Sequence, residues 1–195
     1  MSQKVIYIIP GFGQKTTHKA YRILSQMLRA KGFEPILISI PWKNTTISQN
    51  SEYFINEFKK TKSKEKYILG FSLGAMIAFI ASTKVEVAGL ILCSLSPYFS
   101  EDLPKIGPDW KASTLMRYQD FAGLTCSRLA KQLKAKRIIM FYGSEEVKSL
   151  IKRVKKAYKD IPSAKKYLFE ISKTDHEIGN RRYLAAIHQA TKFLN

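Results

Sequence analysis

Six apolar runs rich in β-branched and aromatic residues alternate along this chain with segments of helical periodicity. The runs predict strands near residues 4–9, 35–40, 66–71, 87–94, 136–142 and 165–171. They are continuous apolar stretches, which is typical of strands that helices cover on both faces. Helices are predicted near residues 17–31, 48–60, 73–83, 113–134, 146–160 and 178–194. Strict alternation of strand and helix favours a three-layer α/β/α fold with a parallel sheet and right-handed crossovers.

Length and composition indicate one globular domain over residues 1–195. The chain is 45% hydrophobic and 25% charged, and it has no internal repeat or low-complexity linker. Its apolar stretches, such as Val87 to Leu95, are too short to span a bilayer. The stretch Val5 to Ile9 is shorter than a usual signal-peptide core, so we interpret it as the first strand. Cys93 and Cys126 have no paired spacing and are expected to be free thiols, which favours a cytoplasmic protein.

The net charge of +18 at pH 7 raises the question of a polyanionic partner. Near residues 148–159 the apolar residues recur at helical spacing and leave a set of lysines on the opposite face: Lys152, Lys155, Lys156 and Lys159. We expect these lysines to form a solvated outer surface that attracts polyanions weakly and nonspecifically. A dedicated polyanion site is the alternative. The chain contains no recognisable nucleic-acid-binding module, and no specific nucleic-acid partner is expected.

The pentapeptide Gly70-Phe71-Ser72-Leu73-Gly74 follows the predicted third strand and opens the next predicted helix. A serine hydroxyl is a weak nucleophile until a base removes its proton, so a nucleophilic serine must stand clear of the sheet and face an imidazole. A tight strand-to-helix turn exposes it in this way. Glycines are needed on either side because a side chain there would collide with the neighbouring strand or helix.

Two later loops contain the residue types that such a serine requires. The predicted fifth strand ends in Gly143-Ser144-Glu145-Glu146, and the predicted sixth strand is followed by Lys173-Thr174-Asp175-His176. Serine, acid and histidine thus occur in the order, and after the strands, at which the α/β-hydrolase family carries them, and the chain resembles that family over nearly its whole length. The resemblance implies Ser72 as nucleophile, His176 as base and Glu146 as acid, with Glu145 the second choice. Asp175 is expected to be structural.

The family resemblance also implies an oxyanion hole and a strand order. The loop Pro10-Gly11-Phe12-Gly13-Gln14 is similar to the family's His-Gly-x segment, with Pro10 in place of the histidine. It implies the backbone N–H groups of Phe12 and Leu73 as oxyanion donors. The implied sheet has six parallel strands in the order 2-1-3-4-5-6. The chain starts directly on the strand that carries this loop, without the family's N-terminal antiparallel hairpin, and resembles its minimal, nearly cap-less members.

The glycine loop fits neither of two nucleotide-binding motifs. A dinucleotide fingerprint needs glycine or alanine where the chain has Thr16, and a phosphate loop needs glycines where it has Ile9 and Gln14. No spacing of Cys, His or carboxylate residues indicates a metal site. No metal and no diffusible cofactor is therefore expected.

A long connection over residues 96–112 follows the predicted fourth strand. It lies on the side of the sheet where open α/β folds bind their ligands. Its aromatic residues Tyr98, Phe99 and Trp110 are candidates for the substrate pocket. The segment is either a short substrate-covering loop or a surface loop anchored by its aromatic side chains.

These observations predict a serine hydrolase that cleaves a small-molecule ester or thioester. Two alternatives remain at this stage. One is a non-catalytic binding protein that keeps the same fold, and the other is an enzyme that applies the same three residues to a lactone or a carbon–carbon bond.

Overall fold

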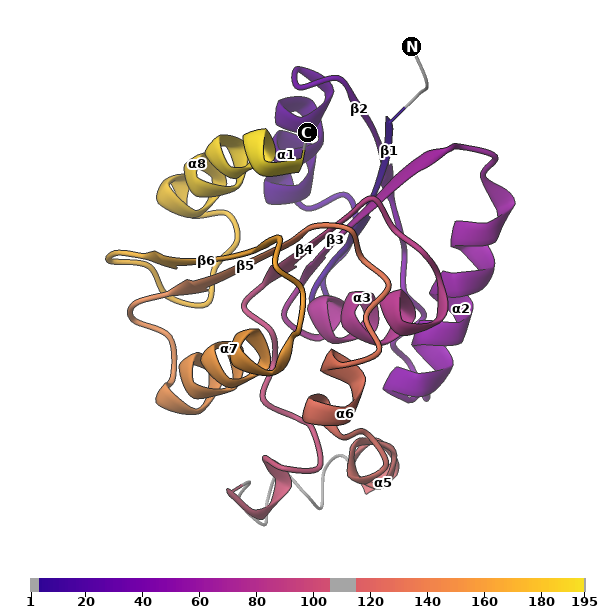
Figure 1. Ribbon diagram of the computed structural model, residues 1–195, viewed down its shortest axis with the longest axis vertical. Helices are drawn as coiled ribbons and strands as arrows, with labels where there is room; N and C mark the ends of the chain where they lie inside the picture. Colours follow the sequence, from indigo (N-terminus) through magenta and orange to yellow (C-terminus); the bar gives the residue numbers. More distant parts are fainter. Residues whose placement is uncertain (1–3, 106–114, 195) are drawn as a thin grey trace.

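The computed structural model describes residues 4–105 and 115–194. Its centre is a six-stranded sheet in the order β2-β1-β3-β4-β5-β6 (Figure 1). Every pair of neighbouring strands is parallel. The strands are β1 (Lys4–Ile9), β2 (Phe33–Leu37), β3 (Glu65–Phe71), β4 (Gly89–Cys93), β5 (Ile138–Gly143) and β6 (Lys166–Ile171). The predicted parallel sheet and its strand order are confirmed.

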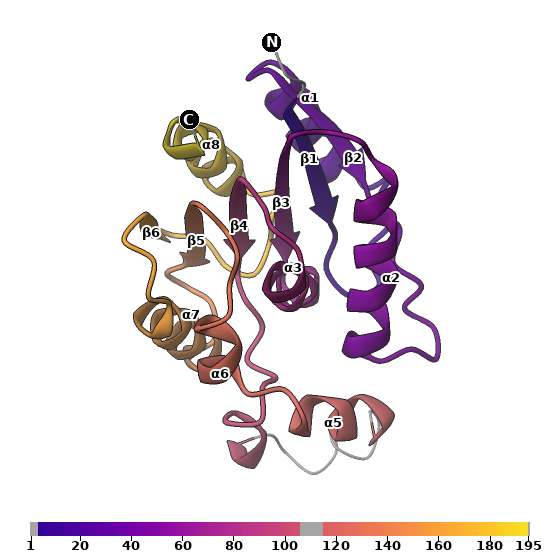
Figure 2. The same ribbon diagram turned by 45° about the vertical axis from the view of Figure 1, so that its right-hand side comes forward.

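Helices cover both faces of this sheet (Figures 1 and 2). One face carries α2 (Ile47–Lys60), α3 (Leu73–Lys84), α6 (Cys126–Ala130) and α7 (Lys148–Asp160), and the other carries α1 (Lys19–Arg29) and α8 (Arg181–Ala190). The helix α5 (Leu115–Ala122) and the 3-10 turns η1 (Leu103–Lys105) and η2 (Thr191–Leu194) complete the described elements. The three predicted layers are present. No helix in residues 4–105 or 115–194 is long and apolar enough to cross a membrane.

The sheet divides the hydrophobic core into two clusters. Along β1, Val5, Tyr7 and Ile9 belong to the cluster under α2 and α3, whereas Ile6 and Ile8 belong to the cluster under α1 and α8. Successive side chains of a strand point to opposite faces, so a strand buried on both sides must be apolar throughout. The helix α3 is apolar for the same reason, because ten of its twelve residues are buried.

The strand β2 lies earlier in the sequence than the apolar run 35–40 suggests. It pairs with β1 from Phe33 opposite Lys4 to Leu37 opposite Ile8. Because β1 ends at Ile9 and Pro10 has no N–H to donate, residues beyond Ile38 have no ladder to join. Pro35 is tolerated inside the strand because β2 is at the edge of the sheet.

The single helix predicted over residues 113–134 is wrong. The structure has α5 and α6 instead, separated by a turn in which the N–H of Gly123 donates to the carbonyl of Asp120 at 3.0 Å. The carboxylate of Glu101 accepts the backbone N–H groups of Cys126 and Ser127 and so caps the start of α6. This cap comes from 25 residues upstream, beyond the reach of any helical periodicity.

Three helices begin later than predicted, the first of them α1, which starts at Lys19 instead of near 17. The last helix starts at Arg181 instead of near 178, after a turn that Asn180 caps by accepting the N–H of Arg182 at 2.9 Å. The helix α7 starts at Lys148 instead of 146. Glu146 therefore lies in the turn between β5 and α7 and not on the helix, which leaves its side chain free to point toward the end of the sheet.

Candidate active site

Ser72 occupies the turn between β3 and α3 in a backbone conformation that L-residues seldom adopt, with φ 56° and ψ −121°. The glycines around it are required by close approach. A Cβ on Gly70 would lie 2.3 Å from the carbonyl oxygen of Gly74, and one on Gly74 would lie 2.3 Å from that of Ile9. Without side chains at these positions the turn fits between β3, α3 and the end of β1, and Ser72 is presented beyond the sheet.

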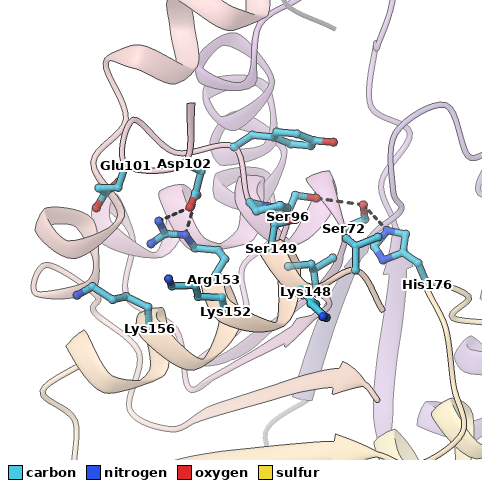
Figure 3. Close-up of a pocket in the computed structure, with 14 residues that line it drawn as sticks. Ser72, Ser96, Glu101, Asp102, Lys148, Ser149, Lys152, Arg153, Lys156 and His176 are labelled. Carbon is cyan, nitrogen blue, oxygen red and sulfur yellow. Dashed lines mark hydrogen bonds and ion pairs between the residues drawn. The ribbon is translucent and has the colours of Figure 1, made fainter. Parts of the chain in front are cut away.

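His176 lies in the loop after β6 and faces Ser72 (Figure 3). Its Nε2 is 2.9 Å from Oγ of Ser72, and its Nδ1 is 2.9 Å from Oε1 of Glu146. The imidazole packs against the ring of Phe71, with the ring centroids 4.9 Å apart. The side chain is 42% exposed, so one edge of the ring remains open to an incoming molecule.

The side chain of Glu146 is fully buried, and both of its oxygens accept hydrogen bonds. Oε2 accepts the backbone N–H of Gly143 at 3.1 Å, and Oε1 faces Nδ1 of His176. A carboxylate in this position keeps the proton of a neutral imidazole on Nδ1, which leaves Nε2 as an acceptor for the hydroxyl of Ser72. Glu145 is exposed, and among residues 4–105 and 115–194 only its backbone is engaged, through a hydrogen bond from its N–H to the carbonyl of Thr174.

Ser96 also contacts the candidate nucleophile, and no sequence motif predicted a role for it. Its Oγ lies 3.2 Å from Oγ of Ser72, and the residue is buried. It follows β4 at the start of the connection predicted to lie near the ligand. Its position after a strand is the one sequence feature that could have indicated a role, because a single serine in such a loop belongs to no recognisable motif. The remaining histidines are elsewhere, His18 just before α1 and His188 within α8.

The loop after β1 is held by side chains that the motif did not reveal. The N–H of Gly11 donates to Oε1 of Gln14 and to the hydroxyl of Tyr21, each at 3.1 Å. The N–H groups of Phe12 and Leu73 donate no hydrogen bond within the described parts of the chain. Both are therefore available as donors to a bound group. Pro10 takes part in the close packing of this loop, since its carbonyl oxygen would lie 2.4 Å from a Cβ on Gly74.

The side chain of Phe12 is half exposed and belongs to a small cluster beside the loop. Its ring meets that of Trp42 edge-on at 5.4 Å, and the guanidinium of Arg117 lies over it at 4.6 Å. Arg117 in turn donates to the carbonyls of Thr45 and Trp42. Burial lowers the pKa of Arg117. The cluster fixes the segment that carries the N–H of Phe12.

A cavity of about 670 Å³ opens onto Ser72 and His176 (Figure 3). One wall is the segment 97–102 after β4, and the opposite wall is α7 with the residue before it, Val147. Of the three predicted pocket residues, Tyr98 lines the cavity and stacks on Phe121 with the centroids 5.5 Å apart. Phe99 does not line it. That side chain is fully buried against Phe79, because its position in the segment points toward the core. Trp110 lies outside the described residues.

The lysines of α7 do not all face the outer solvent, and here the expectation from helical spacing needs correction. All five lysines of this helix are exposed, but three of them line the cavity that contains Ser72: Lys148, Lys152 and Lys156. Helical spacing identifies which face of a helix is apolar. It does not show that part of the polar face borders a cavity formed with a distant segment of the chain.

The two cysteines and Asp175 were also singled out in the sequence. Cys93 and Cys126 are free and buried, and burial is the largest factor that raises the pKa of the Cys126 thiol to about 12. Within residues 4–105 and 115–194, no group of three or more His, Cys, Asp or Glu side chains could hold a metal ion. Asp175 is exposed.

No family model matches the sequence, and no curated protein matches it either. The structure, however, is similar to many solved structures. Est1E of Butyrivibrio proteoclasticus bound to ferulic acid superposes with a TM-score of 0.80 at 12% identity, over 98% of this chain and 87% of that one. The α/β hydrolase GrgF from Penicillium sp. sh18 gives 0.79 at 11% identity, over 100% and 90%. The monoacylglycerol lipase of Paleococcus ferrophilus gives 0.73 at 14% identity, over 100% and 96%. The chain therefore has the α/β-hydrolase fold.

Proposed function

We propose that this protein is a serine hydrolase that cleaves an ester or thioester, with Ser72 as nucleophile, His176 as base and Glu146 as acid. The observation that carries the proposal is the continuous line of hydrogen bonds from Oγ of Ser72 to Nε2 of His176 and from Nδ1 to Glu146. Three residues that lie far apart in the sequence are within hydrogen-bonding distance of one another, as proton transfer from a serine to a histidine requires. Structural neighbours that include a monoacylglycerol lipase make an ester the first substrate to test.

The proposed reaction proceeds in two halves. Oγ of Ser72 attacks the acyl carbon while Nε2 of His176 takes the hydroxyl proton, and the carbonyl oxygen becomes an oxyanion. The N–H groups of Phe12 and Leu73 stabilise this charge, and the N-terminal end of α3 adds its dipole. The tetrahedral intermediate then collapses, and the imidazolium gives its proton to the departing alcohol or thiol. Water then attacks the acyl carbon while Nε2 of His176 removes its proton. The second tetrahedral intermediate breaks its bond to Oγ of Ser72, the imidazolium returns the proton to Oγ, and the carboxylic acid leaves.

In this scheme Glu146 acts on the imidazole and not on the substrate. As a carboxylate it holds Nδ1–H and stabilises the imidazolium that forms when Nε2 takes the proton. Its complete burial matters because charge–charge attraction is stronger away from water. The hydrogen bond from Gly143 fixes the carboxylate in the orientation that reaches His176.

The direct test is labelling by a fluorophosphonate probe, combined with turnover of p-nitrophenyl butyrate. The wild type should label and hydrolyse the ester, and Ser72→Ala should do neither beyond a small residual rate. Ser82→Ala is the matched control, because Ser82 is a buried serine on α3 whose hydroxyl donates to the carbonyl of Phe79. Full activity in Ser72→Ala would exclude the serine mechanism. Absence of labelling and turnover in the wild type would favour a binding protein with this fold.

The bond that is cleaved is tested separately. Parallel assays with p-nitrophenyl esters, thioesters, a γ-lactone and a β-diketone compare the four kinds of bond on one enzyme. We expect the ester or thioester to give the highest kcat/KM. If the lactone or the β-diketone gave a higher kcat/KM than both the ester and the thioester, Ser72 would remain the proposed nucleophile, but the substrate class would be different.

A further inference from the structure

The cavity at Ser72 continues along α7, and three lysines follow it. Lys148, Lys152 and Lys156 are spaced four residues apart, so they lie above one another on one side of the helix. At 1.5 Å per residue the row extends for about 12 Å along the helix axis. In Figure 3 the row follows α7, with Lys148 at the end toward Ser72 and His176 and Lys156 at the end toward Glu101. We refer to these three residues as the lysine row.

The carboxylates that border this cavity are already engaged by other groups. Asp102 accepts two hydrogen bonds from the buried guanidinium of Arg153, at 2.7 and 2.6 Å. Glu101 accepts the N–H groups of Cys126 and Ser127. Neither carboxylate is paired with a member of the lysine row.

Within the lysine row itself, one side chain has a partner in the described part of the chain and two have none there. Lys156 pairs with Asp160 at 2.8 Å. For Lys148 and Lys152 no hydrogen bond or ion pair occurs among the described residues. Two cations nearest the candidate nucleophile are therefore uncompensated at the wall of a concave site, and such a site concentrates their positive potential.

Two other lysines of the same helix do not line the cavity, which shows that this arrangement is not general. Lys155 lies outside the cavity, 4.0 Å from Glu170 and over the ring of Tyr142. Lys159 also lies outside it. The overall charge of +18 would place lysines anywhere on the surface, but it does not account for a row that borders the cavity of Ser72.

We infer that the substrate carries an anionic group, a carboxylate or a phosphate, several bonds away from the carbonyl that Ser72 attacks. Lys148 and Lys152 bind this group while the carbonyl lies between Ser72 and the N–H groups of Phe12 and Leu73. The inference rests on the proposed function and narrows it to anionic esters or thioesters. A cation at this distance from the reacting atoms contributes to binding and orientation, and it takes no part in bond making.

The experiment compares two esters that differ in one charge. The anionic ester is p-nitrophenyl hydrogen adipate, and the neutral ester is its methyl-capped counterpart. The quantity measured is the ratio of kcat/KM for the anionic ester to kcat/KM for the neutral one. The test variant is Lys148→Gln with Lys152→Gln. The matched control is Lys155→Gln with Lys159→Gln, which removes the same charge from the same helix outside the cavity.

We expect the wild-type ratio to exceed one and to fall about two- to fivefold for each lysine removed from the cavity. It should stay at the wild-type value in the control. Sodium chloride should lower the wild-type ratio, because the Debye length shrinks from about 10 Å at 0.1 M to about 3 Å at 1 M. Equal ratios in the two double variants would overturn the inference while leaving ester hydrolysis by Ser72 intact.

A binding measurement makes the result independent of turnover and distinguishes the two anions. Adipate and hexyl phosphate are titrated into Ser72→Ala by calorimetry, with and without each pair of lysine substitutions. Weaker binding of either anion only when Lys148 and Lys152 are replaced supports the site and shows which anion it prefers. Equal binding in both pairs overturns it, even if the wild type proves inactive. If the wild type is not labelled by the fluorophosphonate probe, this result counts against the proposed function and leaves the anion site untouched.

Discussion

Oε1 of Glu146 lies 2.9 Å from Nδ1 of His176, although 30 residues separate them. The two turns that carry them are joined by backbone contacts. The N–H of Ser144 donates to the carbonyl of Ile171, and the N–H of Glu145 donates to that of Thr174, each at 2.9 Å. Because Glu145 is tied by its backbone to the histidine loop, the next side chain turns inward. This local geometry makes Glu146, and not Glu145, the partner of the imidazole.

Replacement of this carboxylate should reduce turnover far more than replacement of its neighbour. Glu146→Gln removes the charge that stabilises the imidazolium and favours the wrong tautomer, so kcat should fall by about 10³–10⁴-fold. Glu145→Gln, at an exposed side chain, should change it less than twofold. Steady-state turnover of p-nitrophenyl butyrate measures both. Reversed effects would move the acid to Glu145, and two small effects would mean that neither residue orients His176.

Ser96 should influence the reactivity of Ser72 through the 3.2 Å contact between the two hydroxyl groups. Ser96→Ala removes one neutral hydrogen bond, worth about 0.5–1.5 kcal/mol, so kcat should fall about two- to tenfold with KM nearly unchanged. Ser96→Thr retains the hydroxyl and should restore most of the loss. A KM effect without a kcat effect would instead place Ser96 among the groups that contact only the substrate.

Gly143 should be essential to the alignment of the acid and histidine turns. A Cβ there would lie 2.3 Å from the carbonyl oxygen of Thr174, so Gly143→Ala must displace backbone. We expect a loss of about 1–3 kcal/mol in unfolding free energy, as for overpacking elsewhere, together with lower kcat. Urea denaturation measures the unfolding free energy, and turnover of p-nitrophenyl butyrate measures kcat. Gly123→Ala is the control, since its nearest contact is 3.4 Å. Equal stability of the two variants would show that the turns can separate without cost.

Glu101 should make the stability of the protein sensitive to acid. Burial by itself would raise the pKa of the Glu101 carboxyl. Hydrogen bonds from the N–H groups of Ser127 and Cys126 outweigh this effect and hold the pKa below its ordinary value. A lowered pKa in the folded state stabilises the fold fully above the unfolded value of about 4.3, and this contribution disappears as the pH falls through the folded pKa.

Urea denaturation at pH 7 and at pH 3 measures this dependence. Glu101→Gln should be less stable than wild type at pH 7, and the difference should shrink at pH 3. Glu145→Gln removes an exposed carboxylate and serves as the control. A difference between Glu101→Gln and wild type that is the same at both pH values would show that the cap of α6 does not depend on the charge.

The sequence by itself determined the sheet and the location of Ser72. Strands buried on both faces must be apolar throughout, and their alternation with amphipathic helices leaves few topologies. The glycines around Ser72 likewise predict its turn, because a sharp turn between strand and helix has no room for side chains. These are local constraints, and they are visible in any short window of the chain.

Only the tertiary structure decided the features that depend on distant segments. The resemblance favoured Glu146 over Glu145, but the contact of Glu146 with His176 depends on a backbone hydrogen bond across 29 residues, between Glu145 and Thr174. The break between α5 and α6 depends on a cap that Glu101 supplies. The division of the α7 lysines into a row along the cavity and a solvated pair depends on where the segment 97–102 crosses the helix. Periodicity reports which side of a helix is apolar, whereas the neighbours of its polar side are set by the folding of the rest of the chain.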